Sequence, residues 1–390
     1  MKKEVIFINS HPIQYFAPLY KYLNENGVST AAWYCTDLSI KGGIDKEFGV
    51  KVKWDIPLLD GYQYRFFRNF SLNPSHENGF FGLFNPGLIK ALFTIPKSII
   101  VVHGWHYCTH ALVLLTARLR GHTVCLRYEM PYNQEVLKTG WKQLLKRLFL
   151  KNILFSQVKH FLFIGTQNRN LYQRLYSVPA NKLVFCPYSV DNIRFTRDYY
   201  QLAVKKTDIR MGYNIPPHAK VILFSGKYIQ KKRPMDVLRA FHNMNLKDCW
   251  LIMLGEGELR GEMEEHIVRH QIKNVILTGF VNQSHVANYY SISDVFVMCS
   301  SVGETWGLSV NEALNFRLPI IISDLTGCSI DLVLPDVNGY IFKTGQVEEM
   351  SDKLYKVLTN IEQFNNNSCE NLLSKHSYST IKDNLKALAD

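Results

Sequence analysis

Short apolar segments alternate with longer amphipathic segments along the chain, and this alternation predicts α/β sheets. In the first half, runs rich in Val, Ile and Phe have the length of buried strands, and segments with apolar positions at helical spacing separate them. Such strand–helix–strand units build parallel sheets. The predicted strands are 4–9, 28–34, 98–102, 123–128, 160–164 and 182–186, and the predicted helices include 15–25, 107–119, 138–155 and 167–176.

A second series of the same kind follows a break in the pattern. Residues 191–218 carry charges, tyrosines and the pair Pro216-Pro217, with no clear strand. Beyond this break the alternation resumes, which predicts a second doubly wound sheet. Its predicted strands are 220–225, 250–254, 274–278, 294–298 and 319–323, and its predicted helices are 234–243, 259–270, 283–290, 308–316 and 347–359.

The two series predict two domains. We expect an N-terminal domain over 1–205, a C-terminal domain over 206–370, and a last segment over 371–390 that packs back on the first domain. Doubly wound sheets bind ligands at the carboxyl ends of their strands. Two such domains that face each other would leave a cleft between them.

The composition is that of a folded protein with a basic surface. Hydrophobic residues make up 47% and charged residues 20%, and 45 Lys and Arg against 33 Asp and Glu give a formal charge of +12. This excess favours phosphates, acidic lipids or nucleic acid as partners. The 8 cysteines are scattered without metal-ligand spacing, which predicts buried free thiols in a reducing compartment.

Neither a signal peptide nor a membrane span is predicted. The chain starts with Met1-Lys2-Lys3-Glu4, and the apolar run that follows is too short for a signal peptide. No apolar stretch reaches the length of a transmembrane helix. We therefore expect a cytoplasmic protein.

The segment Ser300–Leu314 holds two carboxylates around a strand-to-helix turn. Glu304 lies in the turn, and Glu312 lies about two turns along the helix. The free N–H groups at the helix start favour an anion, and Gly307 lets a ligand approach the backbone. A carboxylate in the turn can accept hydrogen bonds from sugar hydroxyls, and one on the helix can hold the two hydroxyls of a ribose. The alternative is that Glu304 only complements the helix charge and Glu312 is solvated.

Several segments together resemble retaining glycosyltransferase family 4, which has the GT-B fold of two Rossmann-like domains facing across a cleft. The second domain matches most specifically. The matching segments are Glu304–Ala313 for the paired-glutamate motif, Phe224–Pro234 for the phosphate-binding strand and loop, Leu254–Leu259 for the Gly-rich turn, Pro187–Phe195 for the end of the first domain, and His11–Phe16 for a bacterial subgroup active in surface-polysaccharide synthesis.

The resemblance implies a reaction and a donor site. A sugar would pass from a nucleotide-sugar donor to a glycan or lipid-linked acceptor with retention. Lys227 and Lys232 would hold the diphosphate, Glu312 the ribose, and Glu304 the sugar. Lys227 stands where the family usually has Arg, and Asn9–Pro12 replaces an often Gly-rich loop. The implied donor-binding residues are Gly226, Lys227, Lys232, Gly255, Glu304, Thr305, Trp306, Gly307, Leu308 and Glu312, with Glu304 and Lys232 also catalytic.

The sequence favours a site without a metal or other cofactor. It contains no Asp-x-Asp, the pattern with which metal-dependent sugar transferases hold a cation on the diphosphate. Two lysines and a helix N-terminus can stabilise the leaving group instead. The alternative for Lys227 and Lys232 is a solvated basic loop, because Lys231, Lys232 and Arg233 form a plain charge run.

The first domain supplies weaker candidates near its predicted strand ends. The family often places a histidine near the donor sugar, and either His103 or His106 is a candidate catalytic residue, although each is as well explained by a structural role. Glu129 could be an acceptor-side base or a fixed hydrogen-bond acceptor. His11 and Gln14 are predicted to contact the acceptor.

A basic amphipathic stretch runs from Lys138 to Lys159. It predicts either an ordinary surface helix with its apolar face in the core, or a helix that rests on acidic lipid at the inner face of the membrane, beside a lipid-linked acceptor. The apolar positions on one helix face are Trp141, Leu144, Leu145, Leu148 and Phe149, and the interspersed basic residues are Lys142, Lys146, Arg147 and Lys151.

Three other functions fit parts of the sequence. A nucleotide-cofactor oxidoreductase could use Gly255-x-Gly257, but the third glycine is misplaced at Gly261 and no acidic residue ends strand 274–278. The charge would suit a non-catalytic binder of nucleic acid or anionic membrane, but no nucleic-acid-binding motif accompanies it, so no nucleic-acid partner is expected. A GT-B sugar epimerase would use the same nucleotide clamp without an external acceptor.

Overall fold

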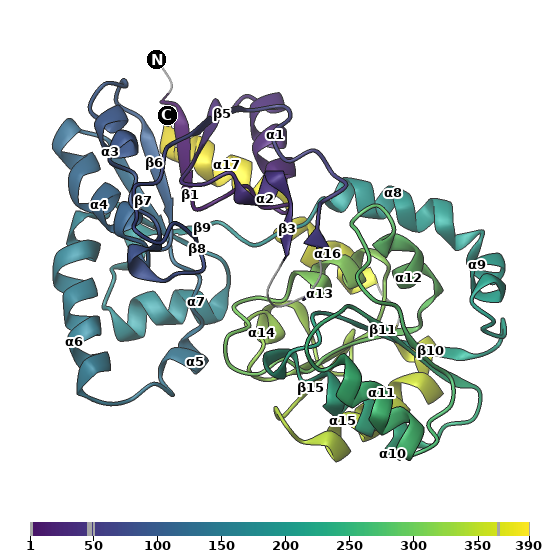
Figure 1. Ribbon diagram of the computed structural model, residues 1–390. Coiled ribbons are helices and arrows are strands. Elements are labelled where there is room, and N and C mark those ends of the chain that lie inside the picture. The colour runs from purple at the N-terminus through teal and green to yellow at the C-terminus, as the bar shows by residue number, and fades with distance from the viewer. Residues whose placement is uncertain (1–2, 45–48, 50, 365–366, 390) are drawn as a thin grey trace. The chain divides into compact units, whose positions relative to one another are not determined.

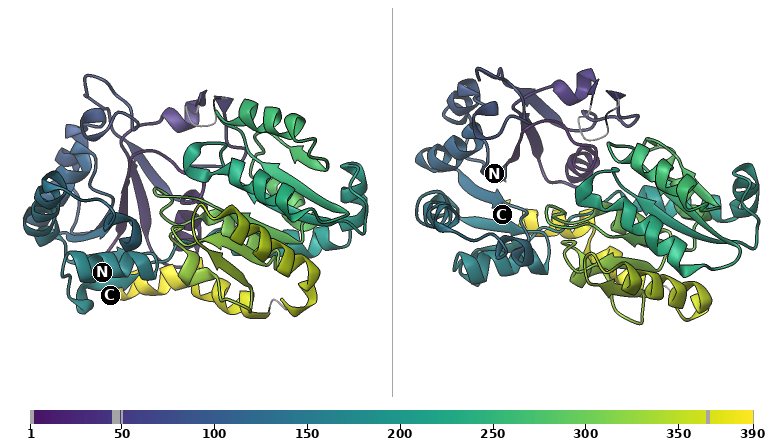
Figure 2. Two further views of the ribbon diagram at one scale, coloured as in Figure 1. Left: turned by 90° about the horizontal axis from the view of Figure 1, so that it is seen from below. Right: turned by 60° about the horizontal axis from the view of Figure 1, so that its bottom comes forward.

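The described residues form two compact α/β units. The computed structural model describes residues 3–44, 49, 51–364 and 367–389. In this described part, the first unit combines residues of Met1–Gly43, Ile56–Tyr188 and Tyr378–Asp390, and the second combines residues of Ile44–Asp55 and Ser189–Ser377. Each unit has a parallel sheet with helices on both of its faces (Figures 1 and 2). The predicted α/β class with two doubly wound domains is confirmed.

The sheet of the first unit has the order β5-β2-β1-β6-β7-β8-β9, and its strand pairs are parallel. The order reverses between β1 and β6, which makes this pair the switch point where such sheets bind ligands. The strands are β1 Val5–Asn9, β2 Thr30–Tyr34, β5 Gln63–Phe66, β6 Ile99–His103, β7 Thr123–Arg127, β8 His160–Phe163 and β9 Leu183–Phe185, with β3 Gly43–Ile44 and β4 Lys51–Val52 paired separately.

Two apolar clusters cover the two faces of this sheet. Side chains alternate along a strand, so Ile6 and Ile8 of β1 enter one cluster and Val5 and Phe7 enter the other. The second cluster also takes in Leu385 from the end of the chain, which places the last helix on the first unit. The helices are α1 Ala17–Glu25, α2 Leu38–Lys41, α3 Pro86–Leu92, α4 Cys108–Thr116, α5 Tyr132–Glu135, α6 Trp141–Phe149, α7 Thr166–Asn170 and α17 Tyr378–Ala389.

The sheet of the second unit has the order β12-β11-β10-β13-β14-β15, again with parallel pairs. This is the order of a dinucleotide-binding sheet, and its switch point lies between β10 and β13. The loops after these two strands therefore begin side by side. The strands are β10 Lys220–Ser225, β11 Cys249–Leu254, β12 Val275–Leu277, β13 Val295–Met298, β14 Ile320–Ser323 and β15 Gly339–Phe342.

The chain passes from the first unit to the second after Tyr188, whereas the sequence placed this boundary at residue 205. The segment in between is helical and packs on the second unit, because α8 contacts α12 and α13. Asp191 caps α8 by accepting a hydrogen bond from the backbone N–H of Arg194 (3.0 Å), and Phe195 is buried beside Phe316. The helices are α8 Asn192–Ala203, α9 Lys206–Gly212, α10 Pro234–Met244, α11 Arg260–Arg269, α12 Val286–Ile292, α13 Leu308–Asn315, α14 Ser329–Leu332, α15 Val347–Thr359 and α16 Asn367–Lys375.

Candidate functional site

Two loops of the second unit meet at its switch point. The loop after β10 runs from Gly226 to Arg233, and the loop after β13 leads from Cys299 to α13. The backbone N–H of Ser301 donates to the carbonyl of Lys231 (2.8 Å), and the thiol of Cys299 lies 3.2 Å from the carbonyl of Lys232. The two sequence motifs, which are about 70 residues apart in the chain, thus form one local structure.

Lys232 and Glu304 form an ion pair that joins these loops. The ammonium group of Lys232 donates to a carboxylate oxygen of Glu304, and their side chains are only 16% and 13% exposed. A solvated basic loop, the alternative for Lys232, is therefore wrong. The cation predicted to hold the diphosphate and the carboxylate predicted to hold the sugar lie together and neutralise each other.

The glycines of the donor motif allow close backbone packing. A Cβ atom at Gly226 would lie 3.6 Å from Cδ of Lys232, so the lysine stem runs beside this glycine. A Cβ atom at Gly255 would lie 2.0 Å from the carbonyl oxygen of Gly226, and one at Gly257 would lie 2.6 Å from that of Tyr228. The Gly-rich turn after β11 is thus held against the loop after β10. Half-buried Lys227 belongs to the same loop, and its contact with a donor stays a prediction.

The turn before α13 is fixed by its buried residues. Gly307 has φ 103°, and a Cβ atom there would lie 2.7 Å from Sδ of Met298, so only glycine fits without strain. Trp306 is 2% exposed, and its indole N–H donates to the side-chain oxygen of Asn311 (2.8 Å). The Trp306 side chain therefore supports the turn, and its backbone is what a ligand could contact. Thr305 and Leu308 are half-buried on either side.

Glu312 is 2% exposed, so the alternative that it is solvated is wrong. The hydroxyl of Tyr290 donates to one carboxylate oxygen (2.7 Å), and the side-chain N–H of Gln283 lies 3.5 Å from the other. Arg194 in turn donates to the backbone and side-chain oxygens of Gln283 (2.9 and 3.0 Å). The sequence did not identify Tyr290, Gln283 or Arg194. A buried carboxylate requires such donors, but no motif shows which residues supply them.

The candidate histidines of the first unit lie at its switch point: His11 is in the loop after β1, His103 is the last residue of β6, and His106 is in the loop that follows. His11 lies 3.0 Å from the hydroxyl of Ser10, and its ring centroid is 4.1 Å from that of His76. The ring of His103 packs edge-on against Phe16, at 4.6 Å between centroids. His106 is exposed. His106 is thus the more accessible of the two candidate catalytic histidines, and its role stays a prediction.

Glu129 is already engaged within the first unit. Arg127, itself 2% exposed, donates to Glu129 (2.7 Å), and the hydroxyl of Tyr188 donates to the other carboxylate oxygen. A carboxylate that neutralises a buried guanidinium is poorly placed to act as a base. This geometry favours the role of fixed hydrogen-bond acceptor. Gln14 lies half-buried in the turn before α1, and its contact with an acceptor stays a prediction.

We expect the free energy of unfolding to fall as the pH is lowered from about 6.5. Removal from water lowers the pKa of His11 to about 3, helped by His76, and removal from water likewise lowers the pKa of His110 to about 3. The unfolded chain then binds protons that the folded chain does not. Each histidine contributes a slope of up to roughly 1.4 kcal/mol per pH unit.

Urea unfolding at a series of pH values measures this slope. His110→Phe, which removes one titrating ring from the interior, should have a shallower slope between pH 6.5 and pH 5 than the parent chain. His218→Gln is the matched control, because His218 is exposed. Equal slopes for the parent chain and His110→Phe would contradict the prediction.

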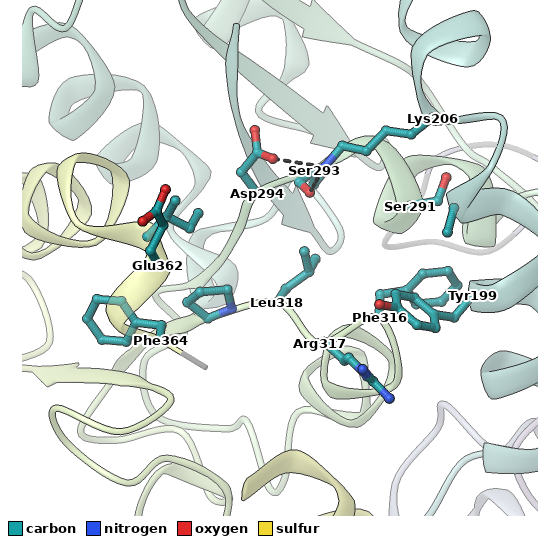
Figure 3. A pocket seen from close by; sticks show the side chains of 13 residues that line it. Tyr199, Lys206, Ser291, Ser293, Asp294, Phe316, Arg317, Leu318, Glu362 and Phe364 are labelled. Carbon is teal, nitrogen blue, oxygen red and sulfur yellow. Dashed lines mark hydrogen bonds and ion pairs between the residues drawn. The ribbon is translucent and has the colours of Figure 1, made fainter. Parts of the chain in front are cut away.

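A pocket of about 410 Å³ lies at the other end of the strands of the second sheet, away from the loops around Lys232 and Glu304 (Figure 3). Asp294 and Pro319 line it, and they directly precede β13 and β14, so the pocket is at the amino ends of these strands. Its Lys206 is paired with Asp294 (2.9 Å). Because ligands of such sheets bind at the carboxyl ends, the loops around Lys232 and Glu304 are the stronger candidate site.

A family model matches most of the second unit, and two curated relatives match less than half of the chain. Residues 205–371 match the family described as glycosyl transferases group 1. An uncharacterized glycosyltransferase of Methanocaldococcus jannaschii, MJ1607, is 25% identical over 185 residues, which cover 45% of this chain and 46% of that protein. The poly(ribitol-phosphate) alpha-N-acetylglucosaminyltransferase of Staphylococcus aureus is 25% identical over 180 residues (43% and 36%). The chain thus matches less than half the length of these relatives.

Similarity to solved structures extends over both units. A glycosyltransferase from Rickettsia africae superposes with a TM-score of 0.74 at 13% identity, over 100% of this chain and 98% of that one. Anabaena Alr3699/HepE in complex with UDP and glucose gives 0.73 at 12% identity, over 99% of each chain. The predicted GT-B fold is therefore confirmed. The family match and the names of the relatives support glycosyltransferase activity.

Proposed function

We propose that the protein transfers a sugar from a nucleotide-sugar donor to a glycan or lipid-linked acceptor, with retention of the anomeric configuration. The observation that carries this proposal is the Lys232–Glu304 ion pair, which joins the two loops at the switch point of the second sheet. The match of residues 205–371 to a glycosyltransferase family supports it. We further propose a role in bacterial cell-surface polysaccharide synthesis, in the cytoplasm at the inner face of the membrane.

The ion pair gives Lys232 and Glu304 complementary parts in the reaction. When the donor binds, its diphosphate would replace Glu304 as the partner of the Lys232 ammonium group. The carboxylate of Glu304 would then be free to accept hydrogen bonds from the sugar hydroxyls. As the bond from the sugar to the diphosphate breaks, negative charge grows on the departing phosphate oxygen, and Lys232 stabilises it. Glu312, oriented by Tyr290, would hold the ribose in both the bound donor and the transition state.

The names of two relatives support the proposed class of acceptor. One relative is named for poly(ribitol-phosphate), and another, an alpha-monoglucosyldiacylglycerol synthase of Streptococcus pneumoniae that is 28% identical over 149 residues, is named for a glycolipid. A hydroxyl on a polymer or on a lipid-linked glycan is the proposed acceptor of this chain. An epimerase with the same nucleotide clamp would need no such acceptor.

A panel of nucleotide sugars tests the proposal. We expect one of them to raise the thermal midpoint of the chain, because a ligand that binds only the folded state stabilises it. With that donor and candidate acceptors, NMR of the product should show the anomeric configuration of the donor. Inversion would contradict the retaining mechanism. Epimerised donor without transfer would identify an epimerase, and a thermal shift with nicotinamide cofactors alone would favour an oxidoreductase.

We expect transfer to survive exhaustive treatment with EDTA. The reason is that Lys232 and Lys227, with the N-terminus of α13, can neutralise the leaving diphosphate in a chain that has no Asp-x-Asp. The measurement is the initial rate of nucleoside diphosphate release before chelation, after chelation and after addition of Mg²⁺ or Mn²⁺. Loss of the rate that either metal restores would show that the site depends on a metal.

A further inference from the structure

Helix α6 has its apolar face turned to solvent. Trp141, Leu144 and Leu145 are 68%, 57% and 56% exposed, whereas an ordinary surface helix buries its apolar side. The expectation of a helix with its apolar face in the core is wrong for this segment. Figure 1 shows α6 among the helices that cover one side of the first unit. The exposed apolar residues, which we call the α6 surface, are Val136, Leu137, Trp141, Leu144, Leu145, Leu148, Phe149 and Ile153.

Glu135 explains why the helix is oriented in this way. Its carboxylate is fully buried and accepts hydrogen bonds from Lys146 (2.6 Å), Lys138 (2.9 Å) and the side chain of Gln143. Burial alone would raise the pKa of Glu135, but the hydrogen bonds and charges of the two lysines lower it. Arg147 also donates to the backbone carbonyl of Glu135 (2.8 Å). The polar side of α6 is thus bound to the protein.

The helix cannot roll over without breaking this network. A roll that buried Leu144 would withdraw Lys146 from a carboxylate inside the protein, and an unpartnered buried charge is strongly destabilising. The continuation of the helix is also anchored, because Leu150 and Leu154 are fully buried. The outward orientation of the apolar face is therefore a built feature of the fold.

The charge around this surface has one sign. Residues 136–190 contain no Asp or Glu. Lys142 and Lys151, which flank the apolar residues on the helix, are exposed. An anionic partner fits this distribution. The basic residues of the segment are Lys138, Lys142, Lys146, Arg147, Lys151, Lys159, Arg169, Arg174 and Lys182.

We propose that the α6 surface docks on a lipid bilayer that contains anionic lipids. The helix would lie in the plane of the interface, with Trp141 and the leucines inserted among the acyl chains and Lys142 and Lys151 at the phosphates. Among the described residues no helix is long and apolar enough to cross a bilayer. A two-fold contact between copies fits less well, because it would bring the lysines of one copy against those of the other.

Vesicle sedimentation of the full chain tests the proposal. The chain should bind vesicles that contain phosphatidylglycerol, and added salt should weaken the binding. Vesicles of phosphatidylcholine alone should bind it weakly. The intrinsic fluorescence should shift to the blue on binding, and Trp141→Phe should lose most of this shift. The assay uses no sugar donor, so its result is independent of the proposed transfer reaction.

Variants separate the apolar and the electrostatic contributions. Leu144→Gln combined with Leu148→Gln should lower vesicle partitioning by roughly tenfold or more, since two large apolar side chains no longer leave water. Lys142→Gln combined with Lys151→Gln should flatten the salt dependence. The matched control is Val204→Gln with Val268→Gln, two valines of the second unit that are 84% and 77% exposed. Its partitioning should equal that of the parent chain.

Three results would overturn the proposal. The first is that the parent chain sediments equally with both kinds of vesicle, or that it sediments with neither kind. The second is unchanged partitioning of the leucine variant, with its fold verified by circular dichroism and its thermal midpoint. The third is a dimer in sedimentation velocity that the leucine variant dissociates, which would assign the surface to self-association.

Discussion

Lys232→Ala should lower the kcat of sugar transfer by roughly a hundredfold to a thousandfold. Negative charge grows on the departing phosphate oxygen as the sugar–phosphate bond breaks, so a cation aimed at that oxygen binds the transition state more tightly than the bound donor. Loss of one preorganised stabiliser of this kind costs about 2.7–4 kcal/mol. Steady-state kinetics over a range of donor concentrations should show a smaller change in KM than in kcat.

Lys231→Ala is the matched control for this prediction. Lys231 is the preceding residue and is also half-buried, but its stem lies against Gly303, where a Cβ atom would approach its Cδ to 2.9 Å. Its loss removes a positive charge from the same loop and leaves the Lys232–Glu304 pair in place. Similar losses of kcat in Lys231→Ala and Lys232→Ala would show that the loop contributes only its general positive charge. That result would contradict the assignment of Lys232.

Stability must be measured beside the kinetics of Lys232→Ala. The substitution leaves Glu304, which is 13% exposed, without the partner that neutralises it. A carboxylate that loses its partner while partly buried destabilises the folded chain. Lys232→Arg keeps the charge and should keep the fold, so it separates the effect on folding from the effect on the transition state.

The strands and helices were the most predictable part of this chain. Hydrophobic spacing places elements well where a strand is buried on both sides, as in β1 and β10, because every residue must then be apolar. It missed β5, whose residues Gln63–Arg65 are exposed at the sheet edge, and β15, a short strand that begins at Gly339. The predicted boundary at residue 205 lies beyond Tyr188, because the contacts with α12 and α13 that attach α8 to the second unit are long-range and no local pattern shows them.

The candidate site was predictable only where a motif encodes it. The turn around Glu304 and the loop around Lys232 could be found from local sequence, but their ion pair could not, since it depends on β10 and β13 lying side by side. The orientation of α6 is a similar case. Its amphipathic pattern is local, whereas Glu135, which binds the polar side of the helix to the protein, lies before the helix and outside that pattern.

Glu312→Ala should raise the KM for the donor by roughly tenfold to a hundredfold, with kcat little changed. The carboxylate is proposed to hold the ribose equally in the bound donor and in the transition state, and loss of such uniform binding affects KM alone. Hydrogen bonds to a charged group contribute about 1.5–3 kcal/mol, which corresponds to this range. Steady-state kinetics with the donor varied at saturating acceptor is the measurement.

Tyr290→Phe is a milder variant that tests the same carboxylate. The Tyr290 hydroxyl donates to Glu312 at 2.7 Å, so its removal should loosen the carboxylate without deleting it. We expect a rise in the KM for the donor that is smaller than that of Glu312→Ala, and a combined variant that is no worse than Glu312→Ala, because the hydroxyl acts through the carboxylate. If the KM for the donor stayed at the parent value in Glu312→Ala, the assignment of the ribose to Glu312 would be wrong. Additive losses in the combined variant would instead give Tyr290 a contact of its own with the donor.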